Sequence, residues 1–164
     1  MDSTPAHTDR LDVPADGEFD SLYEAERVSL LRMATLMVGS SAVAEEVVQD
    51  AFVAVGARWS SLDRPGAYLR TTAVNGCAQV LRRRETERRA LDARLPEPDP
   101  VMPSRLVELR DALDRLTDRQ RLVVVLRYFV DIPDDEIADI LGVRPSTARS
   151  LTRRALNVLR EELA

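Results

Sequence analysis

The sequence predicts an all-α protein of two small helical domains joined by a proline-rich linker. Apolar residues recur at helical spacing along most of the 164 residues, and no segment alternates convincingly with the period of two of a β-strand. Residues 95–104 contain four prolines, which lack the N–H group that a helix interior needs. Near the carboxyl end, two short amphipathic segments meet at a glycine, the pattern of a helix-turn-helix. We therefore expect domains at 19–94 and 105–164, with the linker at 95–104.

The amino-terminal domain is expected to follow an acidic tail and to begin with two helices. Residues 1–18 are rich in Asp, Pro and Thr and predict a disordered segment. An apolar stripe then runs from Phe19 to Met37 and is interrupted at Gly39. Ser41 is the expected cap of the second helix. That helix is expected to bury one face, made of Ala44, Val47, Val48, Ala51, Phe52 and Val55.

Further helices are expected on both sides of the linker. A loop at 60–66 precedes a helix from about Ala67 into the arginine run 82–84. After the linker, leucines at 106, 109, 113 and 116 mark another amphipathic helix. Thr117 and Gln120 have the spacing of a capping box, in which each side chain satisfies the other residue's backbone. The valine-rich run that follows is therefore predicted to be a helix, although its composition also suits a strand.

The carboxyl-terminal helix pair presents one apolar and one basic side. Gly142 can adopt the left-handed conformation that ends a helix, and Pro145 suits the first position of the next one. In that next helix the apolar positions share one side: Ala148, Leu151, Ala155, Val158 and Leu159. Residues 144–160 contain five arginines and no acidic residue. A solvated surface hairpin shows a similar pattern, but the arginine-rich face favours DNA binding, because a guanidinium can grip a phosphate or a guanine edge.

Charge and composition narrow the function classes. Acidic and basic stretches alternate: residues 1–57 and 95–143 are acidic, whereas 58–94 and 144–164 are basic. Two basic patches suggest two DNA contacts, and the acidic segments suggest a second kind of partner. With one cysteine and one histidine we expect no disulfide, metal site or cofactor. The sequence has no apolar run long enough for a membrane span and no signal peptide pattern, so we expect a cytoplasmic protein.

Four sequence blocks, in a fixed order, carry a resemblance to a known family. They are AEEVVQDAFVAV (44–55), AYLRTTAVNGCAQVLRRR (67–84), LTDRQRLVVVLRYF (116–129), and DEIADILGV with STARSLTRRALNVLR (135–160). With a proline-rich linker between the second and the third, the chain resembles the extracytoplasmic-function sigma factors of bacterial RNA polymerase, in their actinobacterial form. The resemblance implies a sigma-70-type factor with region 2 at 19–94 and region 4 at 105–164.

The resemblance implies a role for each block. The polar face Glu45, Glu46, Gln49 and Asp50 matches the helix that docks on the clamp helices of the polymerase's largest subunit, and region 4 is expected to meet the flap. The residues implied at the −10 element are Leu62, Asp63, Arg64, Tyr68, Arg70, Thr71, Asn75, Arg82, Arg83 and Arg84. The residues implied at the −35 element lie on the recognition helix: Arg144, Ser146, Thr147, Arg149, Ser150, Arg153 and Arg154.

Some of these assignments have plainer alternatives. Tyr68 also suits core packing, the arginine run 82–84 also suits a solvated helix end, and Cys77 is interpreted as a packing residue. Arg70, Thr71 and Thr72 depart from the aromatic or aliphatic residues usual in the family, so the packing and the DNA-facing side of that helix are expected to differ. The resemblance implies core polymerase and promoter DNA as partners, and it is compatible with an anti-sigma factor.

Parts of the sequence pattern also suit other functions. A stand-alone helix-turn-helix repressor or activator would bind duplex DNA without polymerase. An anti-sigma-like scaffold would bind polymerase or a sigma factor without selecting promoters. An enzyme is the least favoured, because the sequence offers no nucleophile with a base, no evident carboxylate pair and no phosphate-binding glycine loop.

Overall fold

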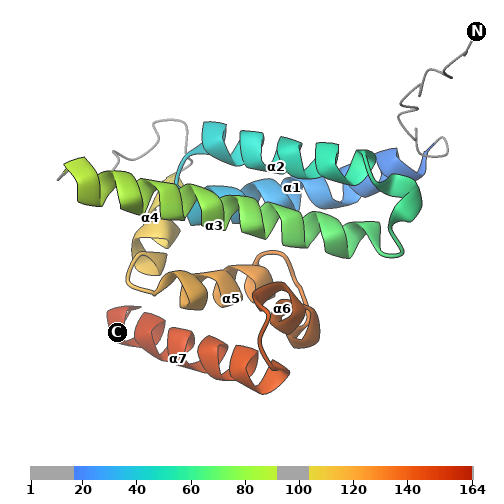
Figure 1. Cartoon of the computed structure of the whole chain (residues 1–164). Helices are drawn as coiled ribbons and strands as arrows, with labels where there is room; N and C mark the ends of the chain where they lie inside the picture. Colours follow the sequence, from blue (N-terminus) through green and yellow to red (C-terminus); the bar gives the residue numbers. More distant parts are fainter. Residues whose placement is uncertain (1–16, 92–103, 164) are drawn as a thin grey trace, which may run out of the picture.

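The amino-terminal half of the protein is a bundle of three long helices (Figure 1). The computed structural model describes residues 17–91 and 104–163. In the first range, α1 (Glu18–Val38), α2 (Ser41–Gly56) and α3 (Pro65–Leu91) pack against one another. A short 3₁₀ turn, Trp59–Ser61, lies in the connection between α2 and α3.

The carboxyl-terminal half contains four shorter helices. They are α4 (Ser104–Leu113), α5 (Asp118–Tyr128), α6 (Asp134–Leu141) and α7 (Pro145–Leu163). The described residues contain no strand, so the all-α prediction is confirmed, including the helical valine-rich run.

Local signals explain most of the helix ends. The Thr117 hydroxyl accepts a hydrogen bond from the backbone N–H of Gln120, and the side-chain oxygen of Gln120 accepts one from the backbone N–H of Thr117. The predicted capping box is therefore present. Gly142 has φ of 62° and ends α6, and Pro145 is the first residue of α7. The predicted buried face of α2 is also confirmed in full.

Four boundary predictions need correction or fall partly outside the described residues. Ser40, not Ser41, caps α2, and its hydroxyl accepts a hydrogen bond from the Val43 amide at 3.4 Å. Helix α3 begins at Pro65 and continues to Leu91, a full turn and more beyond the arginine run, because residues 85–91 are good helix formers linked by Glu85–Arg89 and Glu85–Arg88 ion pairs. The predictions for residues 1–16 and 92–103 lie outside the described range. The last residue of the predicted disordered tail, Glu18, already belongs to α1, and the last residue of the predicted linker, Ser104, belongs to α4.

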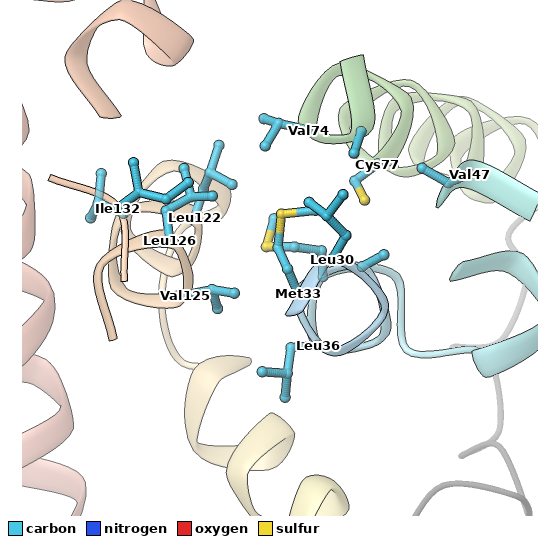
Figure 2. Close-up of a cluster of buried hydrophobic side chains, with 14 of the residues drawn as sticks. Leu30, Met33, Leu36, Val47, Val74, Cys77, Leu122, Val125, Leu126 and Ile132 are labelled. Atoms are coloured by element: carbon cyan, nitrogen blue, oxygen red, sulfur yellow. The ribbon is translucent and has the colours of Figure 1, made fainter. Parts of the chain in front are cut away.

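The two halves share one apolar core, which the sequence did not predict. Helix α5 packs against α1 as well as against α6 and α7. Six consecutive α5 residues, from Arg121 to Leu126, are buried. Figure 2 shows Val125 and Leu126 of α5 facing Met33 of α1, with Val74 of α3 close by. The valine-rich run is apolar all round because α5 lies between the amino-terminal bundle and α7.

Arginine side chains connect helix ends across this core. Arg84 of α3 donates a hydrogen bond to the Val38 carbonyl at the end of α1. Arg110 of α4 donates to the neighbouring Gly39 carbonyl at 3.4 Å. Arg121 of α5 donates to the Leu113 carbonyl at 3.2 Å. Each guanidinium donates to a carbonyl at or just after the last turn of a helix, where the negative end of the helix dipole lies.

Substitution of two left-handed glycines tests the Arg110 contact. Gly39 and Gly142 have φ of 70° and 62°, so alanine at either position costs about 1 kcal/mol of backbone strain. A Cβ at Gly39 would also lie 2.0 Å from Arg110 Cζ, whereas a Cβ at Gly142 meets nothing within 4 Å. We expect Gly39→Ala to lower the free energy of unfolding by ~1 kcal/mol more than Gly142→Ala, measured by urea denaturation. Equal losses would mean that Arg110 relaxes without cost.

Candidate nucleic-acid interface

The exposed side of α7 is a basic surface, and the α6–α7 turn fixes the direction of this helix. The Val143 amide donates to the Ala138 carbonyl at 2.9 Å, which closes the turn behind Gly142. Ala148 and Ala155 of α7 are buried against the preceding helices. Of the seven residues predicted on this side, six are exposed and Ser150 is half-buried; the exposed ones are Arg144, Ser146, Thr147, Arg149, Arg153 and Arg154. The predicted two-sided character of the helix is confirmed.

Helix α5 adds two residues to this surface that the sequence did not single out. Arg127 and Tyr128, at the end of α5, line a depression of about 230 Å³ together with Arg149, Arg153 and Arg160 of α7. Tyr128 is 57% exposed, which is unusual for a large aromatic ring. The sequence signal was the Arg-Tyr pair that follows the apolar run 122–126, but spacing alone did not show that both residues would lie beside α7.

A second candidate surface begins in the loop before α3. Leu62 is half-buried and packs on the core, whereas Asp63 and Arg64 are exposed. Tyr68 is half-buried against the same core, and the Arg58 guanidinium lies 6.0 Å from its ring centroid. Tyr68 therefore packs against the core, as the alternative interpretation predicted, and the Arg58 cation lies over one face of its ring.

Along α3 the predicted residues differ in how far they are exposed to solvent. Asn75, Arg82 and Arg83 are exposed, and Thr71 is half-buried. Arg82 and Arg83 line a shallow groove of about 470 Å³ against α2. Arg84 does not share this exposure, because its guanidinium is bound to the Val38 carbonyl. Burial, together with Arg110 and Arg83 nearby, lowers the pKa of Arg84.

Arg70 is the most engaged of the predicted DNA-facing residues. Its Nη1 lies 2.6 Å from Glu26 Oε1 of α1, and its Nε lies 2.6 Å from Glu136 Oε1 of α6. The departure from the family pattern at this position thus has a structural counterpart: the guanidinium joins three helices from the two halves of the molecule.

The predicted polar face of α2 is open to solvent. Glu45, Glu46, Gln49 and Asp50 are all exposed. Val53, one turn further along, is 64% exposed. Val53 was predicted neither on the buried face of this helix nor on its polar face, and it adds an exposed apolar side chain beside the acidic ones.

The chemistry of the remaining groups is limited. Burial raises the pKa of the Cys77 thiol to about 12, so this side chain packs in the core as a neutral group. Within residues 17–91 and 104–163, the acidic and cysteine side chains form no cluster with the geometry of a metal site. In the same ranges, no helix combines the length and apolar character of a membrane span.

Comparisons with known proteins define the class of protein. Residues 22–87 match the family "Sigma-70 region 2", and residues 112–161 match "Sigma-70, region 4". The chain is 32% identical over 153 residues to an RNA polymerase sigma-E factor of Streptomyces antibioticus, covering 89% of this chain and 84% of that protein. A sigma-E factor of Streptomyces avermitilis is 33% identical over 153 residues, covering 89% and 85%.

A solved structure has the same fold. It is the sigma factor RpoE of Bartonella quintana in complex with the anti-sigma factor NepR, with a TM-score of 0.69 and 24% identity, covering 88% of this chain and 97% of that one. The fold and the two matched regions define a sigma-70-type factor. More narrowly, the chain belongs to the extracytoplasmic-function sigma factors, which bind core RNA polymerase and direct promoter-specific initiation.

Two neighbouring arginines of α3 are predicted to differ in their effect on stability. Arg84→Ala removes the hydrogen bond to Val38 and is expected to lower the free energy of unfolding by about 1–3 kcal/mol. Arg83→Ala removes an exposed side chain with only a 3.7 Å ion pair to Glu87, and is expected to change it by less than ~0.5 kcal/mol. Thermal and urea unfolding of both variants measure this difference. Equal effects would contradict a structural role for Arg84.

Proposed function

We propose that α7 reads the −35 element, while the 60–66 loop and α3 bind the −10 element. The main support is that two basic surfaces lie on different helices, each matched to a different sigma region. Arg149 and Arg153 are exposed and one turn apart on α7, so both guanidinia can meet consecutive base pairs in a major groove. Asn75 offers an amide to a base edge, and Arg82 and Arg83 offer cations to phosphates.

The packing of the loop before α3 supports the proposed contact of this region with the −10 element. Pro65 begins the helix and fixes its direction after the loop, and Leu62 anchors the loop in the core. Asp63 and Arg64 are then carried at an exposed turn between two anchored residues. Arg58 beside Tyr68 keeps a cation near the same turn, which favours an approaching phosphate chain.

The α2 surface is proposed to bind core polymerase. Its acidic residues suit a basic partner and would accelerate encounter, while Val53 would supply apolar contact area. The chain would act in the cytoplasm as a binding and positioning factor and carry out no covalent chemistry of its own. In keeping with the complex reported for the Bartonella relative, an anti-sigma factor is a reasonable further partner.

The main competing function is a repressor that binds duplex DNA without polymerase. A repressor should shift promoter DNA in a gel at physiological salt, with affinity that falls steeply as salt rises. A sigma factor should direct run-off transcription only together with core polymerase. Tight binding of duplex promoter DNA by the isolated chain, without any effect on transcription by core enzyme, would contradict the proposal.

Run-off transcription with matched arginine variants tests the −35 assignment. Arg149→Ala and Arg153→Ala are each expected to weaken promoter use by ~1–3 kcal/mol if the lost contact is bidentate to a base. The effect should disappear on a template whose −35 element is already mutated. Arg119→Ala, an exposed arginine on α5 away from this surface, serves as the control. Loss of activity that is the same on both templates would argue against base contacts from α7.

Binding kinetics with core polymerase test the α2 assignment. Glu46→Arg is expected to lower the association rate constant about tenfold at low salt, because it reverses a charge that faces the partner, and less at high salt. Glu24→Arg makes the same change at an exposed site on α1 and should have little effect. If the two variants associate at equal rates, the polymerase-binding face lies elsewhere.

A further inference from the structure

Arg70 holds together parts of the molecule that the proposed function requires to separate. Glu136 is the third residue of α6, the first helix of the helix-turn-helix, and lies 66 positions from Arg70 in sequence. The two side chains are 18% and 14% exposed, and Glu26 on the other side of the guanidinium is 19% exposed. One arginine therefore pairs with one carboxylate from each half of the chain, largely sheltered from solvent.

The ion pair lies beside the apolar contact between the two halves. Helix α3 packs on α6, and α1 packs on α5. In Figure 2 Val74 and Met33 on one side lie opposite Leu122, Leu126 and Ile132 on the other. The apolar contact supplies the driving force for closure, because it removes apolar surface from water. The Arg70–Glu136 pair fixes which face of α3 is covered.

The closed arrangement is too short to contact both promoter elements. Packed helices lie ~8–10 Å apart, and α3, α6 and α7 are successive neighbours, so α7 lies within ~20 Å of α3. The −10 and −35 elements are named for positions about 25 base pairs apart, which is ~85 Å of duplex at 3.4 Å per base pair. Binding both elements thus requires α4–α7 to move away from α1–α3.

We propose that Glu136 is an intramolecular substitute for promoter DNA, which occupies Arg70 in the isolated chain and must leave before the −10 strand can bind there. This rests on the proposed role of Arg70 at the −10 element. A carboxylate and a phosphate compete for the same N–H groups of a guanidinium. Glu26 belongs to α1 and keeps Arg70 oriented in both states. In the closed form Arg70 is therefore withheld from the −10 strand, and opening of the chain adds this contact to the proposed DNA surface.

The energetics of the pair suit a reversible latch. An ion pair that is largely sheltered from water is little more stable than the two separate, solvated side chains, because the cost of desolvation offsets most of the attraction. Glu136 therefore contributes more to the position of α6 than to overall stability. A partner therefore needs only a modest difference in affinity between the open and closed forms to shift the chain toward the open form. The apparent affinity of that partner rises as the open fraction of the chain rises.

Four full-length single variants, and the double variant Glu136→Gln with Arg70→Ala, test the proposal. Glu136→Arg places a like charge against Arg70 and should open the chain, and Glu136→Gln removes only the carboxylate charge. Asp135→Arg is the matched control, since it makes the same charge change in the same helical turn at an exposed position. Arg70→Ala removes the shared guanidinium. Circular dichroism verifies that each variant keeps its helices.

Two measurements are made on these variants: the radius of gyration from small-angle X-ray scattering, and the affinity for single-stranded −10 DNA. Glu136→Arg should be larger than the wild type and than Asp135→Arg. Glu136→Gln should bind the −10 strand about three- to tenfold tighter, because Arg70 is no longer occupied, and this gain should vanish when Arg70→Ala is also present.

Two results would overturn the inference in distinguishable ways. If Glu136→Arg scatters like Asp135→Arg and Glu136→Gln binds no tighter than the wild type, Glu136 does not hold the chain closed. If Arg70→Ala leaves the affinity for the −10 strand unchanged, Arg70 has no DNA role, and the competition fails together with that part of the proposed function. The scattering result does not depend on the role in DNA binding.

Discussion

The burial of α5 between the amino-terminal bundle and α7 is the contact on which the rest of the structure depends. Its buried stretch from Arg121 to Leu126 meets α1 on one side and α7 on the other. Each half alone is small and encloses a modest apolar core. Shared burial enlarges that core, and it also determines which surfaces stay outside: the basic side of α7, the acidic side of α2, and the loop before α3.

Arginine performs two kinds of work in a chain that contains no lysine. One group, including Arg84, Arg110 and Arg121, satisfies carbonyl groups at the ends of other helices. Another group, including Arg149 and Arg153, has exposed guanidinia on α7. The planar, multiply donating guanidinium suits both tasks, and Lys would supply only a point charge. Arg70 belongs to neither group: its guanidinium pairs with two carboxylates, one from each half of the chain, and it is therefore the arginine proposed to act as a switch.

The sequence was sufficient for the helices, the turn at Gly142 and the capping box at Thr117, because local spacing and backbone preferences determine these features. It also placed the exposed side of α7 correctly, since a 3.6-residue period divides that helix into two faces. It could not provide the partners of Arg70 and Arg84, which are 66 and 46 positions away in sequence. Nor could the sequence show that the valine-rich run packs against both α1 and α7, because an apolar composition predicts burial but not which elements cover the residues.

The central proposal is that α3 and α7 bind two separate promoter elements in the initiation complex. A DNA-cleaving iron chelate attached to a single introduced cysteine tests it directly, since the buried Cys77 thiol, with its pKa near 12, does not compete for the reagent. With core polymerase and promoter DNA, we predict cleavage near −10 from Gln79→Cys on α3 and near −35 from Asn157→Cys on α7. Cleavage of the same short stretch of DNA from both positions would contradict the account.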